Sequence, residues 1–240
     1  MGEDKYSIRI DGDVSGQVAV GTNIDQVQVL RPAEEVEPPV RILFLAANPT
    51  DTDPLRLGEE VRTIDERLRE ADYRDQLDLV PHFAVRLEDL SKSLLRYKPH
   101  LVHFSGHGSP SGAIILEDAS GRSSEVSPKA LGDLFGILRD NLRCVVLNAC
   151  YSATQAEEVS DGIDCVIGTT RRISDHAAIR FAGGFYTGLG YGKSIATAFA
   201  LGQNEIDLAA LGEADTPKLV TREGVDASSI FLVDADGIGP

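Results

Sequence analysis

The 240-residue sequence predicts an α/β fold in which helices cover both faces of a mostly parallel sheet. Two observations carry this prediction. From residue 40 onward, short apolar runs alternate with segments whose apolar residues recur at helical spacing. Runs such as 41–47 and 144–149 are apolar almost throughout, which is typical of strands buried on both faces. In such a fold, the loops at the carboxyl ends of the strands carry the functional residues.

The expected elements follow in chain order. Strands are expected at 41–47, 77–85, 101–105, 144–149 and 165–169. Helices are expected at 55–71, 87–97, 128–141, 153–159, 176–189 and 194–210. Pro99 ends the second helix and Pro128 begins the third, because proline suits only the first turn of a helix. A hairpin is expected at 112–126, and an edge strand is expected from 218–220 and 230–232.

The chain before residue 40 has a different pattern. Residues 31–39 contain three prolines and three glutamates, which predicts a linker to a main domain at 40–240. Residues 1–30 form a β-rich appendage with three short alternating segments, at 8–10, 18–20 and 27–29. So short a segment buries too little apolar area to fold alone. It either caps the main domain or serves as a module for oligomerisation or recruitment.

Composition excludes several classes of partner. Asp and Glu number 38 against 23 Lys and Arg, a formal charge of −15, which disfavours nucleic acid and suits a basic protein or peptide. No run of about eighteen apolar residues could span a membrane and none resembles a signal peptide, so we expect a cytoplasmic protein. The three cysteines show no Cys-x-x-Cys pair. We therefore expect free thiols, no metal and no cofactor.

Two short stretches carry the chemistry. Ser105-Gly106-His107-Gly108 follows the apolar run at 101–104, and Asn148-Ala149-Cys150 follows the run at 145–147. One imidazole and one thiol would thus leave the same edge of one sheet. A thiolate is the attacking species in acyl transfer, and an imidazole supplies the proton that a leaving amine needs. We therefore expect Cys150 to be the nucleophile and His107 the general acid and base.

Glycines beside the histidine add a second prediction. Without a Cβ, Gly106 and Gly108 allow the backbone to approach a substrate closely. The amides of Gly108 and Cys150 together would form an oxyanion hole, in which each donor contributes about 3 kcal/mol to transition-state stabilisation.

These motifs resemble those of the caspase clan of cysteine proteases. Gln-Ala-Cys is typical of caspases, and this chain has Asn148-Ala149-Cys150. The wider pattern, from Phe104 through Gly108 and then 112–117 and 145–150, is closer to the CHAT branch related to separase. The resemblance covers about residues 40–212. It implies a caspase-like three-layer αβα sandwich and a peptidase that works with a Cys-His dyad.

The resemblance also suggests a substrate preference. In CHAT and separase-like proteases, an acidic residue after the strand that follows the cysteine strand binds a basic P1 side chain, the side chain just before the scissile bond. Ile173-Ser174-Asp175 resembles that context, so Asp175 would select Arg or Lys. Arg171 and Arg172 keep open the alternative of cleavage after Asp, which needs a basic receptor.

Several conspicuous residues are expected to have ordinary structural roles. Cys144 and Cys165 lie inside strands and suit core thiols. Asp175 also suits the N-cap of the helix expected at His176. We expect His103 to pack within its strand and Asn148 to order the turn beneath Cys150. Glu59 and Glu60 are expected to face solvent.

The sequence thus favours a regulated protease in a bacterial defence, stress or cell-death module, antiviral defence included. Its substrate would be a protein or peptide, and an activating or recruiting protein, or a second copy of the chain, would bind residues 1–30. The alternative is a non-catalytic adaptor that assembles through the N-terminal β segment. A nucleotide-binding or flavodoxin-like domain is a weaker reading, because Asn48-Pro49-Thr50-Asp51 replaces a glycine-rich loop after the first strand.

Overall fold

The computed structural model describes residues 39–233. The predicted N-terminal strands, and the predicted linker up to Pro38, lie outside the described residues.

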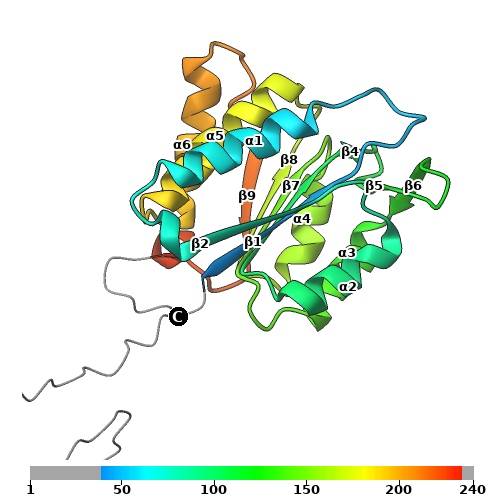
Figure 1. Cartoon of the computed structure of the whole chain (residues 1–240), viewed down its shortest axis with the longest axis horizontal. Coiled ribbons are helices and arrows are strands. Elements are labelled where there is room, and N and C mark those ends of the chain that lie inside the picture. Colours follow the sequence, from blue (N-terminus) through cyan, green and yellow to red (C-terminus); the bar gives the residue numbers. More distant parts are fainter. Residues whose placement is uncertain (1–38, 234–240) are drawn as a thin grey trace, which may run out of the picture. The chain divides into compact units, whose positions relative to one another are not determined.

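A six-stranded sheet forms the centre of the described chain, in the order β2-β1-β3-β7-β8-β9 (Figure 1). Its strands are β1 (Val40–Ala46), β2 (Leu77–His82), β3 (Leu101–Ser105), β7 (Cys144–Asn148), β8 (Cys165–Thr169) and β9 (Pro217–Thr221). The first five are parallel, and β9 pairs antiparallel with β8 at one edge. The predicted mostly parallel sheet is therefore confirmed.

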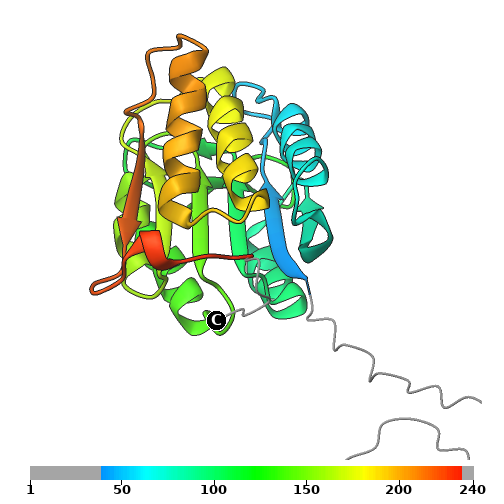
Figure 2. The ribbon, with the colours of Figure 1, turned by 90° about the vertical axis from the view of Figure 1, so that its left-hand side faces the viewer.

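Helices cover both faces of this sheet (Figures 1 and 2). One face carries α1 (Leu57–Arg69), α5 (Asp175–Gly190) and α6 (Ile195–Leu208). The other carries α2 (Leu87–Tyr97), α3 (Pro128–Ile137) and α4 (Ala153–Ser160). Alternate residues of the strands enter two separate apolar cores. In β1, for example, Ile42 and Phe44 pack toward α1 and α5, whereas Leu43 and Leu45 pack toward α2. The three-layer prediction is confirmed.

A small second sheet lies beyond β3. It contains β4 (His107–Gly108), β5 (Ile114–Glu117) and β6 (Ser123–Val126), all antiparallel. The predicted hairpin is thus present, as β5 and β6. The sequence did not predict β4, because two residues are too short to show an alternating pattern. Two short 3-10 helices, η1 (Arg74–Gln76) and η2 (Ala227–Ser229), were also not predicted.

Two predicted strand segments are wrong. Strand β2 ends at His82 instead of residue 85, and the chain turns through Ala84, which has a φ of 54°. Residues 230–232 form no strand. The Ile230 carbonyl instead accepts a hydrogen bond from the Ile195 N–H at 2.9 Å, at the start of α6. The backbone of this apolar segment thus bonds to the start of a helix and not to a neighbouring strand. Its composition does not distinguish the two arrangements.

The register of β3 and β7 brings the two motifs together. Ser105 lies opposite Asn148, and the Gly106 N–H donates to the Asn148 carbonyl at 3.3 Å. His107 and Cys150 each follow this pair by two residues. The two strands that deliver them are direct neighbours, whereas the motif positions predicted only that they leave the same edge of the sheet.

Candidate active site

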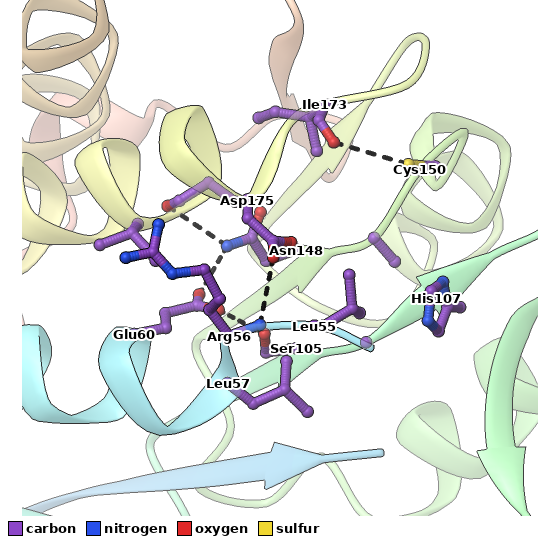
Figure 3. Close-up of a pocket in the computed structure, with 14 residues that line it drawn as sticks. Leu55, Arg56, Leu57, Glu60, Ser105, His107, Asn148, Cys150, Ile173 and Asp175 are labelled. Carbon is purple, nitrogen blue, oxygen red and sulfur yellow. Dashed lines mark hydrogen bonds between the residues drawn. The ribbon is translucent and has the colours of Figure 1, made fainter. Parts of the chain in front are cut away.

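A pocket lies at the carboxyl edge of the sheet, bordered by the ends of β3 and β7 and by the starts of α1 and α5 (Figure 3). His107, Cys150 and Asp175 all line it, although they come from three separate parts of the chain. Glu60 lines it as well, although we expected that residue to face solvent. Gly108 is not a lining residue but packs against the Cys150 backbone.

Cys150 is half-buried in the turn between β7 and α4. Its Sγ lies 3.8 Å from the carbonyl oxygen of Ile173 (Figure 3). The next residue, Tyr151, has a φ of 61°, a left-handed conformation that few residues with a side chain adopt. Ser152 fixes this turn, since its hydroxyl donates to the Leu147 carbonyl at 2.7 Å and accepts from the Thr169 N–H at 2.9 Å. The thiol is thus presented on a tightly bonded turn.

The other two thiols are core residues, as predicted. Cys144 and Cys165 are fully buried and occupy opposing positions in β7 and β8. Burial raises the pKa of Cys165 to about 12 and that of Cys144 well above its ordinary value. Of the three cysteines, only Cys150 is accessible from the surface of the described chain.

His107 is oriented by a backbone group. Its Nε2 lies 2.8 Å from the carbonyl oxygen of Asp53, so Nε2–H donates and Nδ1 is the nitrogen left to accept a proton. Within residues 39–233, no hydrogen bond joins the ring to the Cys150 sulfur. The sequence did not predict this role of Asp53, because the contact is made by its backbone carbonyl. Every residue has that group, so residue type does not reveal it.

Gly108 meets the Cys150 backbone at very short range. A Cβ at this position would lie 1.9 Å from the Cys150 carbonyl oxygen, so only glycine fits. The Ser109 N–H donates to the Ala113 carbonyl at 2.9 Å across the small sheet. Because alternate residues bond across an antiparallel ladder, the Gly108 N–H is directed away from β5.

Asp175 is the first residue of α5, and it is not the N-cap. That part of the prediction is wrong, because Ser174 caps the helix with its hydroxyl accepting from the Ala177 N–H at 3.2 Å. The Asp175 carboxylate instead accepts from the Arg56 N–H at 3.1 Å, at the rim of the pocket (Figure 3). Arg171 is paired with Asp215, and neither Arg171 nor Arg172 lines the pocket.

Glu60 contradicts the prediction of a solvated face. Its residue surface is only 3% exposed, and its carboxylate is bonded to three buried side chains. A signal was present in the sequence, because Glu60 falls on the same face of α1 as Leu57, Ile64 and Leu68. The neighbouring Glu59 is exposed, so adjacent acids on one helix have opposite environments. His103, expected to pack within its strand, is fully buried.

Comparison with known families adds a decisive observation. The CHAT domain family matches residues 15–210, which is most of the chain. This chain belongs to the CHAT domain family. The match begins within the segment that we assign to the N-terminal appendage, and its end agrees closely with the resemblance found in the sequence.

Two relatives of the CHAT chain carry protease names. It is 27% identical over 161 residues to a protein named "Probable protease" from Gillisia limnaea, covering 64% of this chain and 28% of the relative. It is 26% identical over 165 residues to a "Roc-COR-CHAT protease" from an unknown prokaryotic organism, covering 66% of this chain and 16% of the relative. The match spans less than a third of either relative's length.

One solved structure confirms the fold. The CHAT chain superposes on a secreted C11 cysteine protease from Bacteroides thetaiotaomicron, solved with an irreversible peptide inhibitor, with a TM-score of 0.54. The two are 13% identical, and the superposition covers 76% of this chain and 66% of the other. A likeness at this identity concerns the fold, and it agrees with the predicted caspase-like sandwich.

Neither a metal site nor a membrane-crossing helix is present in the part of the chain that the structure describes. Among residues 39–233, no group of three or more His, Cys, Asp or Glu side chains is arranged to hold a metal ion. In the same residues, no helix combines the length and apolarity that a membrane crossing requires.

Proposed function

We propose that this CHAT domain is a cysteine endopeptidase in which Cys150 and His107 form a catalytic dyad. The observation that carries the proposal is the convergence of an accessible thiol and an oriented imidazole on one pocket. Two buried cysteines and a buried histidine elsewhere in the described sheet offer no comparable arrangement.

The reaction follows from these groups. His107 Nδ1 takes the thiol proton, and the Cys150 sulfur attacks the carbonyl carbon of the scissile peptide bond. The tetrahedral intermediate collapses to a thioester as the C–N bond breaks, and the imidazolium gives its proton to the leaving amine. Water, deprotonated by the same imidazole, then attacks the thioester and restores the thiol.

We assign the oxyanion hole to the amides of Gly108 and Cys150. The Gly108 N–H is directed away from β5, and the Cys150 N–H has no hydrogen-bond acceptor among residues 39–233. Two free donors held side by side by close backbone packing suit a developing negative charge.

Cleavage after Arg or Lys is the proposed preference. Asp175 places a carboxylate at the pocket, whereas Arg171 is engaged by Asp215 outside it. Arg56 also lines the pocket, and its guanidinium pairs with Glu59. The available charge therefore favours a basic P1 side chain over an acidic one.

We further propose that the domain is a regulated effector, in a bacterial defence, stress or cell-death module. The Cys150 sulfur faces the Ile173 carbonyl and makes no bond to His107, so the dyad needs a rearrangement before it acts. Both relatives are several times longer than the matched region, and the name of one shows CHAT joined to other modules. Such an arrangement supports control by an associated component, acting through residues 1–30 or elsewhere.

A second candidate is a non-catalytic adaptor with a caspase-like fold. The same separation of the Cys150 sulfur from the His107 ring is the observation that favours it.

One experiment decides between the two candidates. Wild type, Cys150→Ala and His107→Ala would be incubated with fluorogenic peptides that carry Arg, Lys or Asp at P1, with and without cell fractions as activators. Cys144→Ala is the matched control, because it removes a buried thiol that the mechanism does not use. We expect cleavage by wild type and the control alone. Cleavage that persists in Cys150→Ala would contradict the mechanism, and silence of wild type under every condition would favour the adaptor.

A further inference from the structure

We propose that Glu60 is a second acidic determinant of the P1 site, whose buried carboxylate binds the guanidinium of a P1 arginine together with Asp175. The inference rests on the proposed peptidase function and deepens it. It concerns the same pocket, which Glu60 and Asp175 line from two different helices, α1 and α5 (Figure 3).

Three side chains donate hydrogen bonds to the Glu60 carboxylate. His103 Nε2 lies 2.9 Å from Oε1, and Asn148 Nδ2 lies 2.6 Å from the same oxygen. The Ser105 hydroxyl donates to Oε2. Ser105 and Asn148 are opposite each other in β3 and β7, so the carboxylate is held at a fixed point of the sheet.

The donor role of His103 follows from its other partner. His103 Nδ1 lies 3.0 Å from the Tyr186 hydroxyl, which is fully buried. Burial raises the pKa of Tyr186 well above its ordinary value, with smaller contributions from Cys144 and Glu60. The phenol therefore keeps its proton, and with that proton directed at Nδ1 the ring donates to Glu60 through Nε2–H.

Among residues 39–233, no arginine or lysine pairs with the Glu60 carboxylate, and the nearby Arg56 pairs with Glu59. Neutral dipoles offset part of the cost of burying a charge, but a carboxylate has about four acceptor sites and these donors occupy three. A cation brought by a substrate would complete this shell.

The geometry also favours arginine over lysine. A guanidinium presents five N–H donors in a plane and can bond two carboxylates at once, whereas an ammonium is a compact charge. Glu60 and Asp175 line the pocket together, so one arginine side chain can satisfy both.

The test compares a P1 arginine with its neutral isostere, citrulline, in otherwise identical fluorogenic peptides. Glu60→Gln keeps the shape and one acceptor oxygen but removes the charge. We expect it to lower the arginine-to-citrulline ratio of kcat/KM by about tenfold or more. Glu60→Asp, which keeps the charge, should retain part of the ratio. Glu66→Gln is the matched control, because it removes an exposed carboxylate of the same helix that does not line the pocket, and it should leave the ratio unchanged.

An equal loss on both peptides in Glu60→Gln would overturn the inference, since it would mean that Glu60 only supports the two strand ends. Asp175→Asn offers a test that leaves the core intact. If Glu60 contributes, this variant keeps a measurable preference for arginine. Complete loss of preference in Asp175→Asn would overturn the inference even if Glu60→Gln fails to fold.

A binding measurement separates this inference from the proposed hydrolysis. On the Cys150→Ala protein, calorimetry would compare acetylated peptide amides that end in arginine or citrulline. Selective binding that disappears when Glu60→Gln is added supports the inference even if wild type cleaves nothing. Absence of selective binding to the Cys150→Ala protein contradicts the inference, whether or not hydrolysis occurs.

Discussion

Gly108 packs so closely against the Cys150 backbone that no side chain fits at its position. In Gly108→Ala, the added methyl would overlap the Cys150 carbonyl oxygen, 1.9 Å away, and would displace both amides of the proposed oxyanion hole. We expect kcat/KM to fall about a hundredfold or more, with a lower melting temperature. Gly58→Ala is the control, since no atom lies within 4 Å of its added Cβ in the first turn of α1. It should keep activity and stabilise the fold by about 0.5 kcal/mol. Full activity in Gly108→Ala would exclude the assigned oxyanion hole.

Chemical labelling can test the distinction among the three cysteines. With a pKa of about 12, Cys165 is a thiolate in about one molecule in ten thousand at pH 8, and Cys144 is equally buried. Brief treatment of the native protein with iodoacetamide should therefore modify Cys150 alone. Peptide mapping by mass spectrometry would locate the label, and denatured protein, in which all three react, is the control. Comparable labelling of Cys144 in native protein would contradict the described burial.

At this scale, the sequence predicted the residues that a motif marks. Cys150 and His107 were found because strand ends and residue types coincide, and the structure brings both to one pocket. Glu60 was missed because acids on a helix usually face solvent, although its spacing from Leu57 and Ile64 placed it on the apolar face. At this position, the helical spacing of the apolar residues predicts burial better than the acidic side chain predicts exposure.

Helix α2 ends on a residue that costs stability. Lys98 is its C-cap, with a left-handed conformation at φ 44° and ψ 57°, and its N–H donates to the Leu94 carbonyl at 2.9 Å. Glycine adopts this conformation without strain, so Lys98→Gly should stabilise the protein by about 1 kcal/mol. The same substitution inside the helix, Lys92→Gly, should destabilise it by about 1 kcal/mol. Urea unfolding of both variants would measure the opposite signs, and a loss in both would contradict the assigned C-cap.

Elements were predicted best where their own sequence pattern decides the conformation. The bounds of α2, β3 and β8 agree with the sequence prediction, because each has a clear periodic or apolar pattern between turn residues. Strand β4 and the segment at 230–232 were wrong for a shared reason. Their conformation is decided by distant partners, β5 in one case and the start of α6 in the other.

At the scale of the whole molecule, stability should fall in two stages as the pH decreases. Desolvation and the nearby Arg41 lower the pKa of His100 below 6.5, so the unfolded chain binds this proton more readily. The free energy of unfolding therefore begins to fall as the pH drops below about 6.5. Exposed carboxylates with lowered pKa values, such as Asp118 at about 2, contribute only below about pH 4.

His100→Asn isolates the first stage. Its amide oxygen can still accept the Arg41 N–H, which lies 2.9 Å from His100 Nδ1 in the native protein. We expect the variant to lose the decrease between pH 6.5 and 5 while keeping the one below pH 4. Thermal unfolding across that range would measure both. An unchanged first stage in His100→Asn would show that another group titrates there.

The three-layer arrangement was predictable because two apolar cores impose it. Each central strand must supply residues to both faces, and that requirement produces the continuous apolar runs seen in the sequence. Register was not predictable in the same way. That Ser105 lies opposite Asn148 depends on the pairing of strands, which a single sequence does not record.

The starts of α1 and α5 at the pocket have one more consequence. Each helix carries about half a positive charge at its amino end, and backbone N–H groups at such ends commonly bind anions. Glu60 and Asp175 lie in those first turns and reverse the local field. The backbone alone would therefore suit an acidic P1 side chain. We therefore expect that exchange of both carboxylates for neutral residues would shift the proposed P1 preference from basic toward acidic side chains.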